Sequence, residues 1–145
     1  MAHLGTLWNE PALLAEAEAI VEHLPALIER DDLLDITAGA AGGIASLLSL
    51  YRCVPSDRTL TAAIQCGERL TARAQFMADG LGWVIAAAGP ASLTGFSHGA
   101  AGIAWALLEL AALTGEVRFR TAAYAAITYE RSLFSPEAGN WPDLR

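Results

Sequence analysis

The 145-residue sequence is poor in charge and in cysteine. Charged residues make up 17% of it and hydrophobic residues 54%, whereas about a quarter charged is usual in soluble domains. The two cysteines, Cys53 and Cys66, form no CxxC pattern and are too few for a disulfide framework, so we expect reduced thiols. One domain of this length buries roughly 70% of its unfolded surface. The apolar excess indicates a large core or an apolar surface that a partner covers.

The sequence also lacks a long apolar run, a signal peptide and a basic patch. Its longest charge-free windows, 36–51 and 81–108, are interrupted by glycines, Pro90 and His98, and neither supplies the roughly 20 apolar residues of a membrane span. The N-terminus has neither the basic start nor the apolar core of a secretory signal. A net charge of −7 without an Arg cluster argues against nucleic acid. We expect a cytoplasmic protein with no membrane span and no nucleic-acid partner.

Helical patterns account for the whole chain. Alanine and leucine dominate, and apolar residues recur at helical spacing, which predicts an all-α fold of about five helices and no strand. Three regions carry the helices: one helix at 12–29, which Pro25 kinks or splits, a helix pair at 40–79 and a helix pair at 99–133, followed by a terminal segment at 134–145. The first helix of each pair is nearly charge-free and the second is amphipathic. This alternation predicts an inner buried layer and an outer, partly solvated layer.

A shift of 60 residues superposes the chain on itself. The letters GAAG at 39–42 fall on GAAG at 99–102, and Arg58 with TAA at 61–63 falls on Arg118 with TAA at 121–123. The repeat therefore spans a whole helix pair. Such units bury a continuous core only by stacking on neighbours. The sequence predicts part of a double-layered α/α array with barely two and a half units.

Two glycine pairs open the inner helices, Gly39 with Gly42 and Gly99 with Gly102. Glycine lets a neighbouring helix or a ligand approach the backbone closely. Asp35 and His98 stand just before these helices, at the same end of the inner layer. This placement favours a shared pocket with glycine backbone in its wall, His98 as general acid or base, and Asp35 as its partner or anchor. The alternative is that Asp35 and His98 only cap helices.

The other titratable residues suggest no metal site in this chain. Cys66 lies on an apolar stripe and is predicted to be a core residue, while Cys53 ends an inner helix. His3 and His23 are expected on the surface. Nothing assembles the three or four ligands that zinc requires. Trp141 fits either a packing role or a pocket wall.

Three segments resemble the cyclase domain of class II lanthipeptide synthetases, which is related to the free-standing, LanC-like lanthionine cyclases: DITAGAAGGIASLLSLYR, LTGFSHGAAGIAWALLELAALTGE and YERSLFSPEAGNWPDLR. The resemblance covers about Leu33 to Arg145. It implies a toroid of inner and outer helices that adds a peptide cysteine thiol to dehydroalanine or dehydrobutyrine, with zinc activating the thiolate. By the same resemblance His98 matches the active-site histidine that moves protons, and Asp35 matches the aspartate ahead of the first glycine motif.

In the resembled family the zinc ligands, two cysteines and one histidine, lie in repeats beyond the segment that matches NWPDLR. We therefore expect an N-terminal portion of a toroid, excised or truncated, without zinc and inactive alone. The remaining cyclase repeats and a dehydratase domain would complete the enzyme for its precursor peptide, and uncovered flanks predict a homo-oligomer. A non-catalytic helical-repeat scaffold that binds peptides stays open. A glycosidase would need paired acids, for which Asp35 and Asp32 are the candidates.

Overall fold

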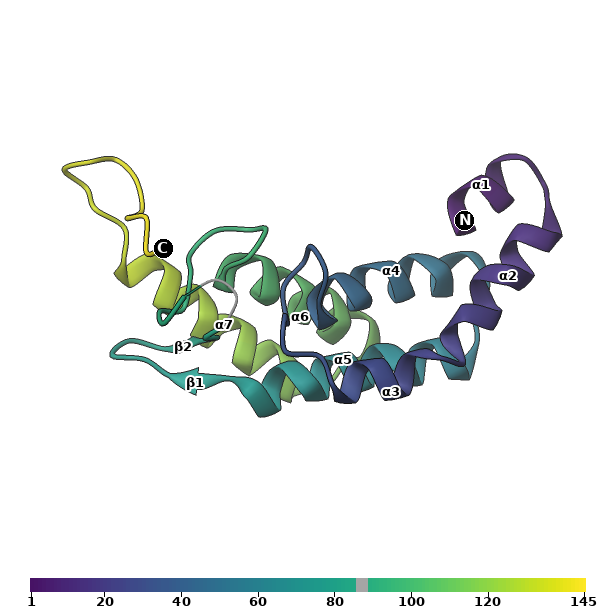
Figure 1. Ribbon diagram of the computed structural model, residues 1–145, viewed down its shortest axis with the longest axis horizontal. Helices are drawn as coiled ribbons and strands as arrows, with labels where there is room; N and C mark the ends of the chain where they lie inside the picture. Colours follow the sequence, from purple (N-terminus) through teal and green to yellow (C-terminus); the bar gives the residue numbers. More distant parts are fainter. Residues whose placement is uncertain (86–88) are drawn as a thin grey trace.

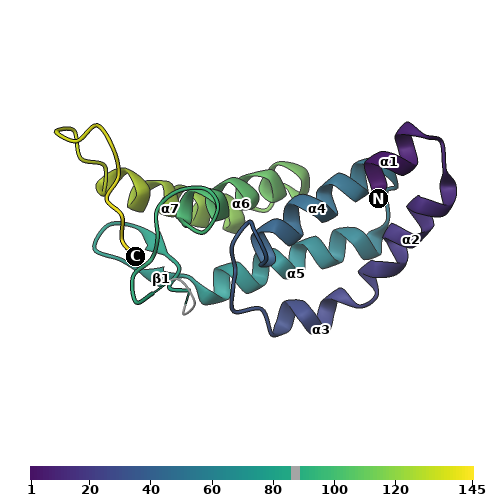
Figure 2. The ribbon, with the colours of Figure 1, turned by 45° about the horizontal axis from the view of Figure 1, so that its top comes forward.

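The computed structural model describes residues 1–85 and 89–145, and the predicted all-α fold is confirmed there (Figure 1). Its elements in chain order are α1 (Ala2–Leu7), α2 (Pro11–Val21), α3 (Leu24–Glu29), α4 (Ala40–Cys53), α5 (Asp57–Arg73), β1 (Gln75–Phe76), β2 (Leu81–Gly82), α6 (Ala100–Thr114) and α7 (Val117–Ser132). They are laid out along the long axis, and the two termini lie at opposite ends in both views (Figures 1 and 2). The described chain is thus an open array of helices.

Two helix pairs form the centre of this array. Helix α4 packs against α5, α6 packs against α7, and the two inner helices α4 and α6 pack against each other (Figure 2). Each inner helix begins directly after a glycine N-cap, Gly39 or Gly99. Both helices carry fully buried side chains, among them Ile44 and Ile103. The 60-residue repeat of the sequence is therefore a repeat of structure, held mainly by apolar burial.

Exposed ion pairs join equivalent helices of the two repeats. Arg118 of α7 lies 3.0 Å from Glu68 of α5, and Arg52 of α4 lies 2.8 Å from Glu109 of α6. Such surface pairs contribute about 0–1 kcal/mol each. They fix the relative placement of the repeats less than the shared core does.

The N-terminal third contains more helices than the sequence predicts. The expected 12–29 helix is divided into α2 and α3, because the chain turns at Glu22 and His23 and places Pro25 in the first turn of α3. Proline is tolerated there, since a first-turn N–H has no helical acceptor. A short helix, α1, also precedes them and packs against α2 and α4.

Helix α5 ends six residues earlier than expected. The backbone becomes extended at Ala74, and β1 and β2 form a two-stranded antiparallel hairpin where the sequence analysis expected no strand. Gly80, at φ +82°, makes the reversal, and a Cβ at this position would come within 2.1 Å of the Ala125 carbonyl oxygen on α7. Met77 still packs against the core from the hairpin. The helical spacing of apolar residues therefore continues past the end of the helix and misleads prediction.

The inner helix α6 is less enclosed than expected. Its Trp105 side chain is 40% exposed and packs against Phe96, with ring centroids 5.6 Å apart. Helices α4, α5 and α7 cover the other sides of α6, so this face is left to its own preceding loop. In the described ranges 1–85 and 89–145, no helix has both the length and the apolar character needed to cross a membrane.

Candidate functional site

The loops that precede α4 and α6 meet at one end of the inner layer. The Asp35 carboxylate oxygen Oδ2 lies 2.6 Å from Nδ1 of His98, and the Thr37 hydroxyl donates a 3.1 Å hydrogen bond to the Ser97 carbonyl. The structure thus brings together the two residues that the sequence placed at this end. Neither acts merely as a cap of its own helix, because both inner helices have glycine N-caps without a side-chain bond.

The surroundings of Asp35 determine which atoms of the pair can react. Asp35 is only 4% exposed, and its Oδ1 accepts the N–H groups of Thr37 at 2.9 Å and Ala38 at 2.8 Å. Because a carboxylate oxygen accepts hydrogen bonds, the short contact to Oδ2 requires the proton to be on Nδ1 of His98. With Nδ1 held by Asp35, Nε2 is the ring nitrogen that remains for a ligand, on a side chain that is 55% exposed. Asp35 and His98 form an oriented acid–histidine pair.

The four glycines make room for the loops. A Cβ at each would come far inside contact distance of loop backbone: Gly39 at 2.3 Å from Leu34 N, Gly42 at 2.2 Å from Ile36 O, Gly99 at 2.3 Å from Thr94 O, and Gly102 at 1.9 Å from Phe96 O. Each pair therefore lets its own preceding loop fold back over the first helical turn. Their role as backbone wall of a substrate pocket stays a prediction.

Ile36 couples the two glycine pairs. Its carbonyl oxygen occupies the space above Gly42, and its Cγ1 would lie 2.7 Å from a Cβ at Gly102 of the other repeat. It follows Asp35 directly in the chain. Ile36 thus contacts α4 through its carbonyl and α6 through its side chain, which sets the position of the Asp35 turn relative to the His98 loop.

Glu130 is a site residue that the sequence analysis missed. It is only 7% exposed, and its Oε1 accepts the N–H groups of Gly95 at 2.7 Å and Ala101 at 2.8 Å, on either side of His98. Burial raises the pKa of the Glu130 carboxyl above its usual value, and the two N–H groups oppose that shift. A signal was available, because Glu130 continues the helical spacing of the buried residues Phe119, Ala123 and Ala126.

Asp31, from a different position in the chain, makes the corresponding hydrogen bonds in the first repeat. Its carboxylate accepts the N–H groups of Leu33 at 2.9 Å and Ala40 at 2.7 Å, on either side of Asp35. Ala40 is the first residue of α4, so the carboxylate satisfies an N–H that the glycine N-cap leaves without a side-chain partner. A carboxylate thus closes each of the two loops that present the acid–histidine pair.

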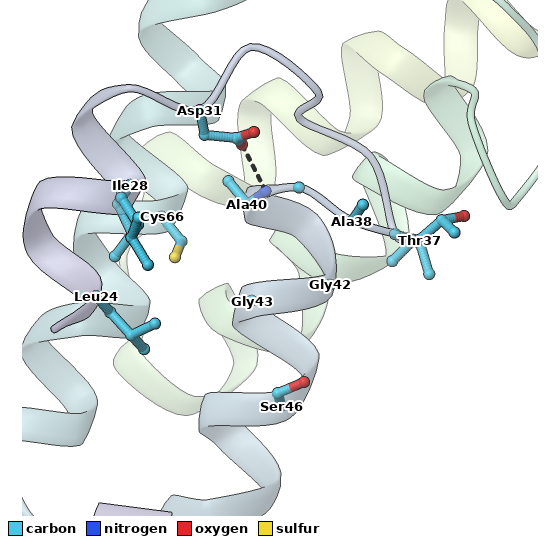
Figure 3. Close-up of a pocket in the computed structure, with 13 residues that line it drawn as sticks. Leu24, Ile28, Asp31, Thr37, Ala38, Ala40, Gly42, Gly43, Ser46 and Cys66 are labelled. Carbon is cyan, nitrogen blue, oxygen red and sulfur yellow. Dashed lines mark hydrogen bonds between the residues drawn. The ribbon is translucent and has the colours of Figure 1, made fainter. Parts of the chain in front are cut away.

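Two cavities flank the pair. The first, about 500 Å³, lies between α3 and α4. Figure 3 shows Leu24, Ile28 and Cys66 across from Gly43 and Ser46, with Asp31 bound to the Ala40 N–H at the rim. Gly39 and Gly42 line this cavity. It is largely apolar in its lining and contains no part of the His98 loop.

The second cavity, about 450 Å³, contains His98. Loop 93–98 forms one wall and segment 140–145 forms the other. Trp141 has both roles left open by the sequence: it lines this cavity, and its indole N–H donates a 2.7 Å hydrogen bond to the Glu130 carbonyl. Gly99 and Gly102 line neither of these two cavities. Gly39 and Gly42 thus line one cavity and His98 lines the other, and the shared substrate pocket stays a prediction.

The residues of the described ranges do not fit a zinc ion. Among them no three His, Cys, Asp or Glu side chains lie close enough together to hold a metal. Cys66 is in the core, as predicted, and burial, with a smaller effect of Asp31, raises the pKa of its thiol to about 12. Zinc binds the thiolate, which Cys66 does not supply near neutral pH.

The described chain is a helical-repeat protein whose two packed repeats bring an aspartate and a histidine into contact at one end of the inner layer. The sequence matches the Lanthionine synthetase C-like protein family over residues 1–145. The chain therefore belongs to this family, and its fold is an all-α part of the family's toroid. No curated protein and no solved structure matches the chain.

Proposed function

We propose that this chain provides the proton-transfer half of a lanthionine-forming site of the class II synthetase type. The observation that carries the proposal is the 2.6 Å contact between buried Asp35 and exposed His98 beside a cavity. Membership of the Lanthionine synthetase C-like family supports the reaction class. The substrate would be a dehydrated precursor peptide that carries cysteine thiols.

The reaction adds S–H across a carbon–carbon double bond. The thiol sulfur forms a bond to the β-carbon of dehydroalanine or dehydrobutyrine, the π electrons pass to the α-carbon and its carbonyl as an enolate, and the α-carbon then takes up a proton. No atom is lost, because the proton that leaves sulfur equals the proton that carbon gains. A single residue that accepts and returns one proton therefore suffices as acid–base catalyst.

His98 is suited to this transfer. Its free Nε2 accepts the thiol proton, and the imidazolium formed lies against the Asp35 carboxylate, which stabilises the positive charge. The same Nε2–H then returns the proton to the α-carbon of the enolate. The other oxygen of Asp35 accepts the N–H groups of Thr37 and Ala38, which holds the carboxylate in place beside the ring. Its role is orientation and charge stabilisation.

Zinc, as the resemblance implies, would supply thiolate activation in the complete enzyme. Since the described residues do not fit the ion, we propose that the remaining cyclase repeats, outside these 145 residues, supply its ligands. The dehydratase domain would be a further part of the complete enzyme. The chain alone is then expected to contain no zinc and to form no thioether rings.

The proposal is tested by titrating a dehydroalanine- and cysteine-containing peptide into uniformly ¹⁵N-labelled chain. We expect the His98 ring signals to shift on binding, and His98→Asn to weaken the response at Gly95. Elemental mass spectrometry gives zinc per chain, which should be near zero. Peptide binding that leaves the His98 signals unchanged would contradict the proposal, and so would about one zinc per chain together with ring formation that survives His98→Asn.

A non-catalytic peptide-binding scaffold is the second candidate. It is favoured by the exposed aromatic pair Phe96 and Trp105, which offers apolar surface next to the His98 loop. Under this function, peptide affinity is unaffected by His98→Ala and falls on Trp105→Ala. The two substitutions measured with one peptide distinguish a site built around the histidine from one built around the aromatic rings.

A further inference from the structure

We propose that Glu130 is a positioning residue that fixes both walls of the His98 cavity. The assignment rests on the proposed function only in taking His98 as the reacting residue. Glu130 belongs to α7, an outer helix, and does not itself line the described cavity. It acts through the backbone and side chains that it holds.

The side chain of Glu130 closes the His98 loop. Gly95 lies three residues before His98 and Ala101 three residues after it. One oxygen, Oε1, accepts both N–H groups, and Gly95 has a φ of +90°, where the loop changes direction. An ordinary N-cap satisfies only N–H groups of the first helical turn. Glu130 also reaches Gly95 outside the helix, so it sets the loop and the helix relative to each other.

The main chain of Glu130 holds the opposite wall. Its carbonyl oxygen accepts the indole N–H of Trp141 at 2.7 Å, and Trp141 lines the cavity together with His98. Trp141 also packs edge-on against Phe134, with ring centroids 4.7 Å apart. A single residue of α7 therefore connects the loop that presents His98 to the segment facing it.

The first repeat uses the same device independently. Asp31 accepts N–H groups on both sides of Asp35, as Glu130 does on both sides of His98. One carboxylate comes from the loop itself and the other from an outer helix. Two different chain positions thus perform the same closure for the two members of the pair.

The test compares the variants Glu130→Ala, Glu130→Gln and Glu130→Asp with the wild-type protein, each as the full chain. Tyr129→Phe is the matched control. Tyr129 is the neighbouring buried residue whose hydroxyl bonds to the Ser92 carbonyl, so its loss removes a buried hydrogen bond without touching Gly95 or Ala101. Two signals are read: the ¹⁵N shifts and Nδ1 proton of the His98 ring, which report its tautomer, and amide hydrogen exchange at Gly95 and Ala101.

In Glu130→Ala we expect a mixed His98 tautomer and exchange at Gly95 and Ala101 that is faster by about 10- to 100-fold, the range for losing a hydrogen bond to a charged group. Glu130→Gln keeps an oxygen acceptor and should therefore retain the wild-type His98 tautomer and the wild-type exchange rates. Tyr129→Phe should leave the tautomer unchanged. If Glu130→Ala does not fold, Glu130→Asp decides, because its shorter side chain cannot reach both N–H groups and should release Gly95.

A wild-type tautomer and wild-type exchange in Glu130→Ala, or in Glu130→Asp if only that variant folds, would overturn the assignment. These signals need no peptide and no turnover. If the variants respond as expected while peptide leaves His98 unperturbed, the proposed function fails and the positioning role stands. If peptide perturbs His98 but the Glu130 variants do not change it, the positioning role alone fails.

Discussion

Two adjacent glycines of α4 provide a sharp test of why the inner helices open with glycine. A Cβ at Gly42 would lie 2.2 Å from the Ile36 carbonyl oxygen, whereas a Cβ at Gly43 would meet only the Cys66 sulfur at 3.2 Å. Gly42→Ala and Gly43→Ala add the same methyl group to the same helical turn. They differ in whether the methyl group meets the loop that carries Asp35.

The expected magnitudes follow from these distances. Ordinary contact begins near 3.4 Å, so the Ile36 carbonyl must retreat by about 1.2 Å in Gly42→Ala. Overpacking of this kind costs about 1–3 kcal/mol, and replacing a helical glycine with alanine returns about 1 kcal/mol. We expect Gly42→Ala to lose up to about 2 kcal/mol and Gly43→Ala to change by no more than about 1 kcal/mol in either direction. The pair should differ in Tm by several degrees, at about 4 °C per kcal/mol.

Urea unfolding followed by circular dichroism measures both variants, and the His98 Nδ1 proton signal reports the site. Because Ile36 follows Asp35 directly, Gly42→Ala should also broaden or shift that signal, and Gly43→Ala should not. If Gly42→Ala is as stable as Gly43→Ala and leaves the His98 signal unchanged, the loop does not need the space above Gly42. The role assigned to the glycine pairs would then be wrong.

Three further predictions follow from burial and exposure. With a thiol pKa of about 12, only about one Cys66 in 10,000 is ionised at pH 8. A disulfide reagent should therefore label Cys66 in urea and not in the native state. Rapid labelling of the native protein, assigned by peptide mapping, would place Cys66 outside the core. Because burial raises the pKa of Glu130, folding favours its protonated form. The stability of wild type relative to Glu130→Gln should therefore be greatest below pH 4.5 and fall as pH rises through the raised pKa. A relative stability that rises with pH would mean that folding lowers this pKa. Apolar surface is exposed on α6 and α7 at Leu113, Val117 and Tyr124. We therefore expect light scattering to show a concentration-dependent oligomer, which Tyr124→Glu weakens. A wild-type monomer at high micromolar concentration would exclude this interface.

Local patterns in the sequence were sufficient for the helices and their repetition. The charge-free and amphipathic segments predicted α4 to α7, since burial of an apolar stripe is what makes a helix of this length stable. The same reasoning failed at residues 74–79, where apolar spacing continues but Gly80 packs against α7 and reverses the chain. It also left Glu130 out of the candidate site, because a pattern of residue types does not reveal that two N–H groups meet the carboxylate.

The contact between Asp35 and His98 separates what the sequence determines from what the tertiary structure determines. By itself the sequence determined that both residues precede equivalent inner helices at one end of the layer, since a 60-residue repeat places equivalent positions alike. Only the tertiary structure decided that Oδ2 of one lies 2.6 Å from Nδ1 of the other, that the glycines admit the loops, and that Glu130 and Asp31 close them. The physical reason is that spacing along the chain fixes the face and the end of a helix, whereas hydrogen-bond partners depend on packing between segments up to 63 residues apart.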